Sequence, residues 1–283
     1  MLLLLITAAI WGFAFVAQRM GMESLDPFSY NAIRFAMGAI FVWMVLLRKR
    51  KVGSKAPWLM GIVLFVAASF QQVGIVYTGA GSAGFITGLY VVMVPLLGVL
   101  RRQKPGRSSY LAIALAVCGL YFINRPESLQ ASLGNLLVLI SAGFFAWHVQ
   151  LVDYYTGKYD TGALAFMQFA ICSVLSLASA FVWHGVEAPM YFMGSGFADG
   201  VRQAILPLLY GGLLSVGIAY TLQIKAQQRT EPTKAAIVLC SEGVFALLGG
   251  WLILGEEIGI RTLIGAVLIL AAMLLSSLAK HFD

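Results

Sequence analysis

Ten long apolar segments follow one another along the 283-residue chain, and they constrain its fold more than any other feature. An α-helix rises about 1.5 Å per residue, so about 20 apolar residues cross the roughly 30 Å hydrocarbon core of a bilayer. A helix also satisfies its own backbone polar groups where water is absent. The sequence therefore predicts an all-α integral membrane protein with ten transmembrane helices, at residues 2–18, 28–47, 58–77, 82–100, 109–124, 133–152, 162–184, 204–224, 235–254 and 261–279.

The composition excludes a soluble protein of this length. Hydrophobic residues make up 60% of the chain and charged residues 11%, whereas about 25% of the residues of a soluble domain are charged. The net charge of +7 does not indicate a nucleic-acid partner, because the basic residues cluster in short connections between apolar segments. Cys118, Cys172 and Cys240 lie inside apolar segments without metal-ligand spacing, so we expect no metal and no cofactor.

The distribution of basic residues predicts the orientation. With the N-terminus in the cytoplasm, the inner connections hold 14 Lys and Arg residues and the outer connections hold four. The inner set includes residues 48–55, 101–107, Lys158 and Lys280, and the outer set includes Arg125. Because cytoplasmic connections carry the excess of positive charge, we expect a multi-pass protein of a bacterial inner membrane with both termini in the cytoplasm. The apolar start of the chain is read as a retained first helix.

The sequence repeats itself at two constant offsets. The first offset, of 134 residues, aligns Asp26 with Asp160, and it places the first two predicted helices on the sixth and seventh. The second offset, of 152 residues, aligns Gln71 with Gln223, and it places helices three to five on eight to ten. Each half contains five helices, an odd number, so the halves must enter the membrane from opposite sides. We predict two inverted five-helix repeats, residues 1–130 and 131–283, which form one membrane domain; secondary transporters often have this plan, with the site near the midplane.

Four segments resemble the EamA-type carriers of the drug/metabolite transporter superfamily: "AAIWGFAFVAQR" (8–19), "IRFAMGAIF" (33–41), "GFITGLYVVMVPLLG" (84–98) and "VLCSEGVFALLGGWLILGEE" (238–257). The last resembles a family pattern of Glu-Pro-Val-Phe-Ala followed by Gly-Trp and Gly-Glu, with Gly243 at the proline position. The resemblance covers essentially the whole chain. It implies that small metabolites cross through a central cavity, and the amino-acid exporter branch fits best.

Arg34 and Glu242 are the charged residues that lie well inside the predicted helices. A charge at that depth costs at least about 2.5–3.5 kcal/mol on insertion scales, so such residues usually face a wet cavity or a partner. One interpretation is that both face the cavity and meet the carboxylate and ammonium of an amino acid. The other is that each bonds neighbouring polar groups and holds helices together. A direct ion pair between them is a third arrangement that the spacing allows.

Other polar and aromatic residues complete the predicted site. Gln71 and Gln223 are expected to point inward, since an amide facing lipid is costly, and Gln168 occupies the position equivalent to Arg34. His148 is either a proton site or a hydrogen-bonding residue between helices. Aromatic residues are expected either to line the cavity or to pack between helices. The predicted substrate-binding residues are Trp11, Arg34, Gln71, Tyr77, Tyr90, Trp147, His148, Gln168, Tyr220, Gln223 and Glu242, and Tyr210 is a further aromatic candidate.

Together these features predict a transporter that moves small amphipathic metabolites by alternating access. Amino-acid export is the favoured function. Its partners would be the small-molecule substrate and membrane lipid, and it would be a monomer or a homodimer. Helices one to four and six to nine would build the cavity, and the fifth and tenth would be scaffold or dimer contact. The motif at 79–84, "GAGSAG", is read as a tight turn and not as a nucleotide-binding loop, because no strand precedes it. The alternatives are a drug or nucleoside/sugar-type carrier on the same fold and, less favoured, an intramembrane enzyme or lipid-handling protein.

Overall fold

The computed structural model describes residues 1–47, 58–103, 106–123 and 129–278, and every regular element in these ranges is a helix. Within the described residues, eight helical segments are long and apolar enough to cross a membrane. Two shorter apolar stretches, Tyr110–Gly119 and Ile260–Ala272, lie in the remaining two predicted segments. The predicted all-α membrane fold is therefore confirmed. The whole basic run 48–55, and also Lys104, Arg125 and Lys280, lie outside the described residues.

The helices follow the apolar segments closely, with small differences at their ends. In chain order they are α1 (Leu2–Gly21), α2 (Pro27–Val42) with its π-helical end η1 (Trp43–Leu47), α3 (Trp58–Tyr77), α4 (Ala80–Gly88), α5 (Tyr90–Leu100), α6 (Arg107–Ile123), α7 (Leu129–Thr156), α8 (Thr161–His184), η2 (Gly185–Glu187), α9 (Ala188–Met193), α10 (Ser195–Gln203), α11 (Ile205–Leu209), the π-helix η3 (Tyr210–Tyr220), α12 (Thr221–Gln227), α13 (Pro232–Leu239), α14 (Glu242–Gly249), the π-helix η4 (Gly250–Leu254) and α15 (Ile260–Leu278).

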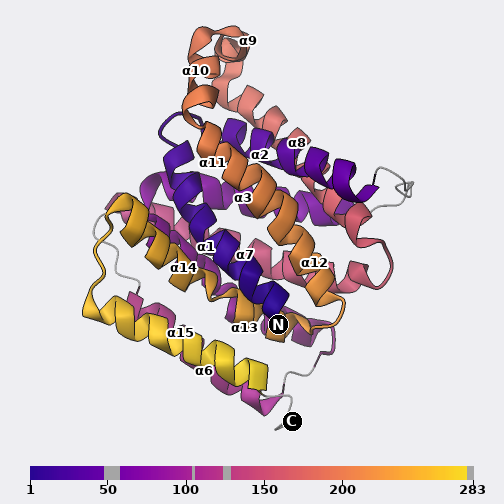
Figure 1. The fold of residues 1–283 in the computed structure, drawn as a ribbon, viewed down its shortest axis with the longest axis vertical. Coiled ribbons are helices and arrows are strands. Elements are labelled where there is room, and N and C mark those ends of the chain that lie inside the picture. Colours follow the sequence, from indigo (N-terminus) through magenta and orange to yellow (C-terminus); the bar gives the residue numbers. More distant parts are fainter. Residues whose placement is uncertain (48–57, 104–105, 124–128, 279–283) are drawn as a thin grey trace.

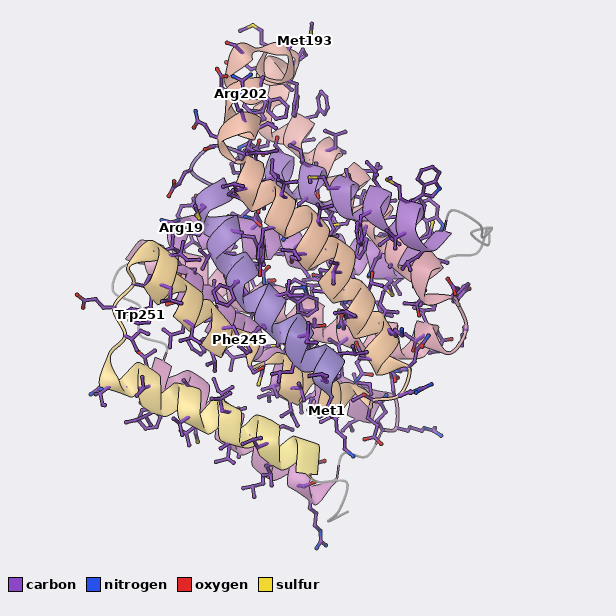
Figure 2. All side chains as sticks on the ribbon, viewed as in Figure 1. Met1, Arg19, Met193, Arg202, Phe245 and Trp251 are labelled. Atoms are coloured by element: carbon purple, nitrogen blue, oxygen red, sulfur yellow. The ribbon has the colours of Figure 1, made fainter. Side chains whose placement is uncertain are left out.

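Figure 1 shows how these helices are arranged. α1 runs diagonally through the middle of the bundle, between α14 on one side and α11–α12 on the other. α6 and α15 pack on each other at the lower left edge. The connection 185–203 projects at the top, where Figure 2 labels Met193 and Arg202. This connection between two membrane helices folds into η2, α9 and α10.

Two helices of the bundle begin with matching caps. The Asp26 carboxylate accepts hydrogen bonds from the backbone N–H groups of Phe28 (3.0 Å) and Ser29 (2.9 Å) at the start of α2. The Asp160 carboxylate accepts one from Gly162 N–H (3.1 Å) at the start of α8. A carboxylate at this position satisfies free donors and suits the positive end of the helix dipole. The two caps are the residues that the first repeat offset aligns, so equivalent positions have the same local structure.

Two predicted membrane helices are interrupted near their middle. α4 and α5 are separated at Leu89, and α13 and α14 are separated at Cys240–Ser241. In the second interruption the Ser241 hydroxyl donates to the carbonyl oxygen of Val238 (2.7 Å), and the Cys240 thiol donates to that of Ile237 (3.0 Å). Such side chains compete with the backbone for helical carbonyls, which explains a break without the proline that the family pattern has at position 243.

The segment 79–84 is not the tight turn that the sequence predicted. Gly79 is the residue before α4, and Ala80 to Gly84 already belong to that helix. The carboxylate of Glu256, from the connection before α15, accepts hydrogen bonds from the N–H groups of Ala80 (3.0 Å) and Gly81 (3.2 Å). A distant carboxylate therefore caps the start of α4, and the glycines let the two segments of the chain approach each other.

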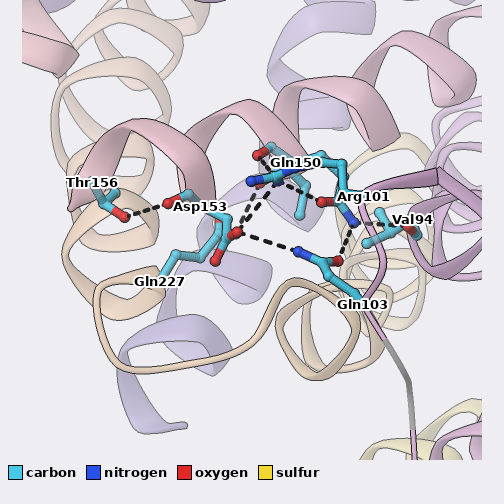
Figure 3. A network of polar contacts seen from close by, with 8 residues as sticks. Val94, Arg101, Gln103, Gln150, Asp153, Thr156 and Gln227 are labelled. Carbon is cyan, nitrogen blue, oxygen red and sulfur yellow. Dashed lines mark hydrogen bonds and ion pairs between the residues drawn. The ribbon is translucent and has the colours of Figure 1, made fainter. Parts of the chain in front are cut away.

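A polar network joins the end of α5 to α7 (Figure 3). Arg101 donates to the backbone carbonyl (2.7 Å) and the side-chain oxygen (2.8 Å) of Gln150, and pairs with Asp153 at 3.3 Å. Gln150 in turn donates to the carbonyl oxygen of Val94 (2.9 Å) and to Gln103 (3.0 Å). These bonds fasten the two helices at the end of the bundle that also holds Met1 and α12.

Gly12 allows α1 to cross α14 at very short range, beside Phe245 in Figure 2. A Cβ atom at Gly12 would meet the Cβ of Phe245 and lie 2.6 Å from the carbonyl oxygen of Glu242. We expect Gly12→Ala to destabilise the protein by about 1–3 kcal/mol, because backbone atoms must move. Gly143→Ala in α7, where a new Cβ meets only the Met93 sulfur at 3.8 Å, is the control. Thermal unfolding of the purified variants measures the difference, and equal melting temperatures would contradict this packing.

Candidate functional site

A cavity lies inside the bundle, and both halves of the chain line it. About 480 Å³ of space between atoms belongs to it, including space that is open to solvent. Its lining comes from α1, α2, α3, α4, α5, α7, η3, α12, α13 and α14. The lining residues are Trp11, Ala14, Phe15, Gln18, Arg34, Gln71, Thr87, Tyr90, Phe145, His148, Val149, Ser215, Tyr220, Gln223, Leu239 and Glu242.

The cavity is narrow and has a mostly buried lining. Fourteen of its 16 lining residues are buried, and the exceptions, Trp11 and Phe145, are half-buried. The centre of a water-sized sphere reaches only about 40 Å³ of the space. A ligand larger than a few water molecules therefore needs the helices to move apart before it enters.

Eight of the 11 sequence-predicted site residues line this cavity. They come from seven different predicted membrane helices, so the fold gathers residues that are far apart in the sequence. They are Trp11, Arg34, Gln71, Tyr90, His148, Tyr220, Gln223 and Glu242.

Three predicted residues lie elsewhere. Tyr77 and Trp147 are 42% and 40% exposed on the outer surface of the bundle, so the expectation that they line the cavity was wrong. Tyr77 is the last residue of α3, and Trp147 lies on a face of α7 that points away from the cavity, beside Phe144 and Ile140. Gln168 is buried behind the lining, where it bonds His148. Tyr210, the further aromatic candidate, also lies off the cavity.

The sequence missed several lining residues, and Gln18 is the most informative. The predicted first helix ends at residue 18, which places this amide at the membrane surface, whereas α1 continues to Gly21 and buries it. The first repeat offset aligns Phe145 with Trp11, so the repeat was a signal that could have found Phe145. Thr87 and Ser215 carry no such signal, because small hydroxyl residues are common in membrane helices.

Arg34 and Glu242 both line the cavity but form no ion pair with each other in the described structure. Arg34 donates from Nε to the side-chain oxygen of Asn31 (2.8 Å), one turn earlier in α2, and its guanidinium lies 4.8 Å from the ring centre of Phe35. Glu242 is the first residue of α14 and is 3% exposed. The Tyr90 hydroxyl is its neighbour, but neither that hydroxyl nor Oε1 of Glu242 has a hydrogen-bond partner among the described residues.

Other polar groups of the lining are bonded to protein atoms. Gln71 donates to the Thr87 hydroxyl at 3.1 Å and so ties α3 to α4. The Trp11 indole N–H donates to the carbonyl oxygen of Ser215 at 3.2 Å. Nε2 of His148 lies 2.7 Å from the side-chain oxygen of Gln168, which supports the interpretation of His148 as a bond between helices α7 and α8.

Most of the lining consists of residue pairs that the repeat offsets relate. Twelve of the 16 lining residues form six such pairs, three at the first offset and three at the second. The pairs are Trp11 with Phe145, Ala14 with His148, Phe15 with Val149, Gln71 with Gln223, Thr87 with Leu239 and Tyr90 with Glu242. The two halves thus offer corresponding positions to one cavity, although they place different residues there.

The remaining helices surround or support the site. α6 and α15 contribute no lining residue and pack against each other at the edge of the bundle, as the sequence predicted for the fifth and tenth helices. α8 was expected to line the cavity but supplies none of the lining residues; it acts through Gln168 on His148. The resulting site brings a cation, an anion, amides and aromatic rings together on the lining of one cavity.

Gln71 and Gln223 provide a matched test of this geometry. Gln71→Leu removes a bond between α3 and α4, so we expect a loss of about 1–3 kcal/mol of stability. The second offset aligns Gln223 with Gln71 and Leu239 with Thr87, and the side-chain oxygen of Gln223 has no partner among the described residues, so Gln223→Leu should leave stability unchanged or raise it. Thermal unfolding of both variants measures these changes in stability. An equal loss in both would contradict the predicted difference between the two amides.

Comparison with known proteins adds the family. The sequence profile of the EamA-like transporter family matches residues 1–125 and 132–278. An "Uncharacterized transporter" of Archaeoglobus fulgidus is 30% identical over 276 residues, which are 97% of this chain and 84% of that protein. The "Uncharacterized transporter YoaV" of Bacillus subtilis is 23% identical, with 95% and 93% of the two chains covered. A solved crystal structure shares the fold, with a TM-score of 0.75 at 18% identity over 99% of this chain and 98% of that one.

Proposed function

Since the chain belongs to the EamA-like transporter family and is a multi-pass membrane transporter, we propose that it moves small amphipathic metabolites, and above all exports amino acids, by alternating access. The proposed route is the cavity between the two halves. The observation that carries the proposal is the presence of Arg34 and Glu242 on the lining of one cavity without an ion pair between them in the described structure.

A zwitterion matches this arrangement of charge. The α-ammonium of an amino acid would meet Glu242, and its α-carboxylate would meet Arg34. Both protein charges are 3% exposed, and buried charges that lack compensation are costly. A substrate that brings both opposite charges offsets that cost at two points, whereas a neutral sugar or nucleoside offsets neither.

The aromatic part of the lining suits the apolar part of such a substrate. Trp11 and Tyr220 lie with their ring centres 4.6 Å apart, and Phe15 and Phe145 also line the space. Apolar lining with a few placed polar groups is the usual composition of a small-molecule site. The narrowness of the cavity favours small side chains in this form.

The packing of helices supports two inverted repeats, residues 1–130 and 131–283. α3 packs on α7, and its counterpart pair under the two offsets, η3–α12 with α1, is also in contact. α2 packs on η3, and the counterpart pair, α8 with α3, does the same. Two pairs, α2 with α8 and α6 with α15, map onto themselves, and α4 with α14 maps onto α13 with α5, which are also in contact. We propose that alternating access rests on an exchange of conformations, in which each half adopts the conformation that the other half had.

We further propose that the protein lies in a bacterial inner membrane with both termini in the cytoplasm, because of the excess of basic residues in the inner connections. It would act as a monomer or as a homodimer, and the α6–α15 edge, which lies outside the cavity, is the proposed dimer contact.

Two glycines give a matched test of the orientation. Gly157 and Gly196 lie in exposed connections, and a Cβ atom at either would meet nothing within 4 Å. In a background without the native cysteines, we expect Gly196→Cys to react in intact cells with a thiol reagent that does not cross membranes. Gly157→Cys should react only after the cells are permeabilised. The opposite pattern would reverse the orientation.

Removal of the Glu242 charge tests the function. Glu242→Gln keeps the size of the side chain, so we expect the protein to fold and insert. Its exchange of labelled amino acids across liposomes should fall about tenfold or more, the effect of losing about 1.4 kcal/mol from a charged contact. Glu257→Gln, at an exposed residue in the connection before α15, is the control.

The same liposomes separate the candidate functions. Normal amino-acid exchange by a well-folded Glu242→Gln variant would contradict the proposed role of the carboxylate. Exchange of nucleosides, sugars or apolar drugs, with none of amino acids, would favour the alternative carrier on the same fold. Chemical alteration of the solute during the assay would indicate an enzyme.

A further inference from the structure

The polar atoms that line the cavity divide into two sets, and the division is informative. Trp11, Gln71 and His148 have protein partners, as described above. Four other lining residues each have one buried polar atom without any hydrogen-bond partner in the described structure: Gln18 (Oε1), Tyr90 (the hydroxyl), Gln223 (Oε1) and Glu242 (Oε1).

These four residues are all deeply buried, between 1% and 3% exposed. A buried polar atom without a partner costs about 1–3 kcal/mol, so four in one place are expensive unless a ligand bonds them. They come from four helices, α1, α5, α12 and α14, and therefore from both halves of the chain. Tyr90 and Glu242 are the first residues after the two helix interruptions, and the second repeat offset aligns them with each other.

The chemistry of the unpaired set is one-sided. Three of its atoms are carbonyl or carboxylate oxygens, which only accept hydrogen bonds, and the fourth is the Tyr90 hydroxyl, which accepts and donates and neighbours the Glu242 carboxylate. A ligand that bonds the three acceptor oxygens must supply N–H or O–H donors, and Glu242 favours a positive one. A primary ammonium has three donors and a positive charge. A quaternary ammonium has the charge but no donor, and a carboxylate has neither.

The cationic side of the cavity has a smaller need for a ligand. Nε of Arg34 already donates to Asn31, and the guanidinium lies 4.8 Å from the ring centre of Phe35 and 5.8 Å from that of Tyr30. Contact with aromatic rings stabilises a buried cation. Part of the Arg34 charge is thus compensated within α2 itself, without a substrate carboxylate.

We infer that Gln18, Tyr90, Gln223 and Glu242 form a primary-ammonium subsite, and that this subsite, more than Arg34, decides which molecules the transporter accepts. The inference rests on the proposed function and narrows it. Amines that lack a carboxylate are ligands of the cavity, whereas the corresponding acids that lack an amine are not.

Four small molecules of one shape test the inference: leucine, isopentylamine, 4-methylpentanoate and isopentyl-trimethylammonium. Binding to the purified protein is measured by calorimetry, and competition is measured against exchange of labelled leucine in liposomes. Isopentylamine should bind within about tenfold of leucine, and the acid and the quaternary ammonium at least about 100-fold more weakly. Binding of the acid or of the quaternary ammonium as tight as that of the primary amine would overturn the inference.

Two buried glutamines provide the variant and its control. Gln18→Leu removes one acceptor from the cavity, and we expect isopentylamine to bind about tenfold more weakly. Gln72 is equally buried and also has an unpaired side-chain oxygen within the described structure. Its side-chain nitrogen lies 3.5 Å from the backbone carbonyl oxygen of Gln18. Gln72 does not line the cavity. Gln72→Leu should leave binding unchanged. Equal effects of the two substitutions, or no effect of Gln18→Leu, would overturn the assignment.

The outcomes also separate this inference from the proposed function. Binding of isopentylamine with no exchange of any amino acid would leave the subsite in place and contradict amino-acid transport. Amino-acid exchange without binding of the amine would leave the transport function and contradict the subsite. Failure of all four molecules to bind would overturn the inference as well.

Discussion

The cost of burying charge within a bilayer is the constraint on which the rest of this structure depends. Lipid offers no partner to Arg34 or Glu242, so both must face the interior of the bundle. Their placement in one cavity requires helices from both ends of the chain to meet, and glycines such as Gly12 permit the close crossing of α1 and α14. The packing around the cavity can therefore be read as the means of holding two charges and several amides away from lipid at fixed positions.

The sequence predicted the fold well because one physical signal dominates it. Apolar length defines a membrane helix almost without reference to the rest of the chain, and the predicted segments agree with the observed helices to within a few residues. The interruptions at Leu89 and Cys240–Ser241 were not predicted, since they depend on local hydrogen bonds that leave apolar length unchanged. The helical connection 185–203 was missed because it is short and of mixed polarity.

The site was predicted less evenly, and the reason is chemical. Arg34, Glu242, Gln71 and Gln223 line the cavity and Gln168 is buried behind it, since charged and amide groups have only one acceptable direction inside a membrane, away from lipid. Aromatic residues have two, because a ring packs against lipid as well as against a ligand, and this explains why Tyr77 and Trp147 lie on the outer surface. Gln18 was missed because α1 continues past the predicted helix end, as far as Gly21.

The paired positions of the cavity wall have a consequence for how cargo travels. Under the proposed repeat the two halves place different residues at corresponding positions, such as Thr87 and Leu239 or Ala14 and His148, so the two parts of the chamber differ in chemistry. Under the proposed mechanism, a molecule held by one end stays in register with the protein while the chamber opens first to one side and then to the other. It would then cross the membrane without turning, so that the end that enters first on one side is also the end that leaves first on the other.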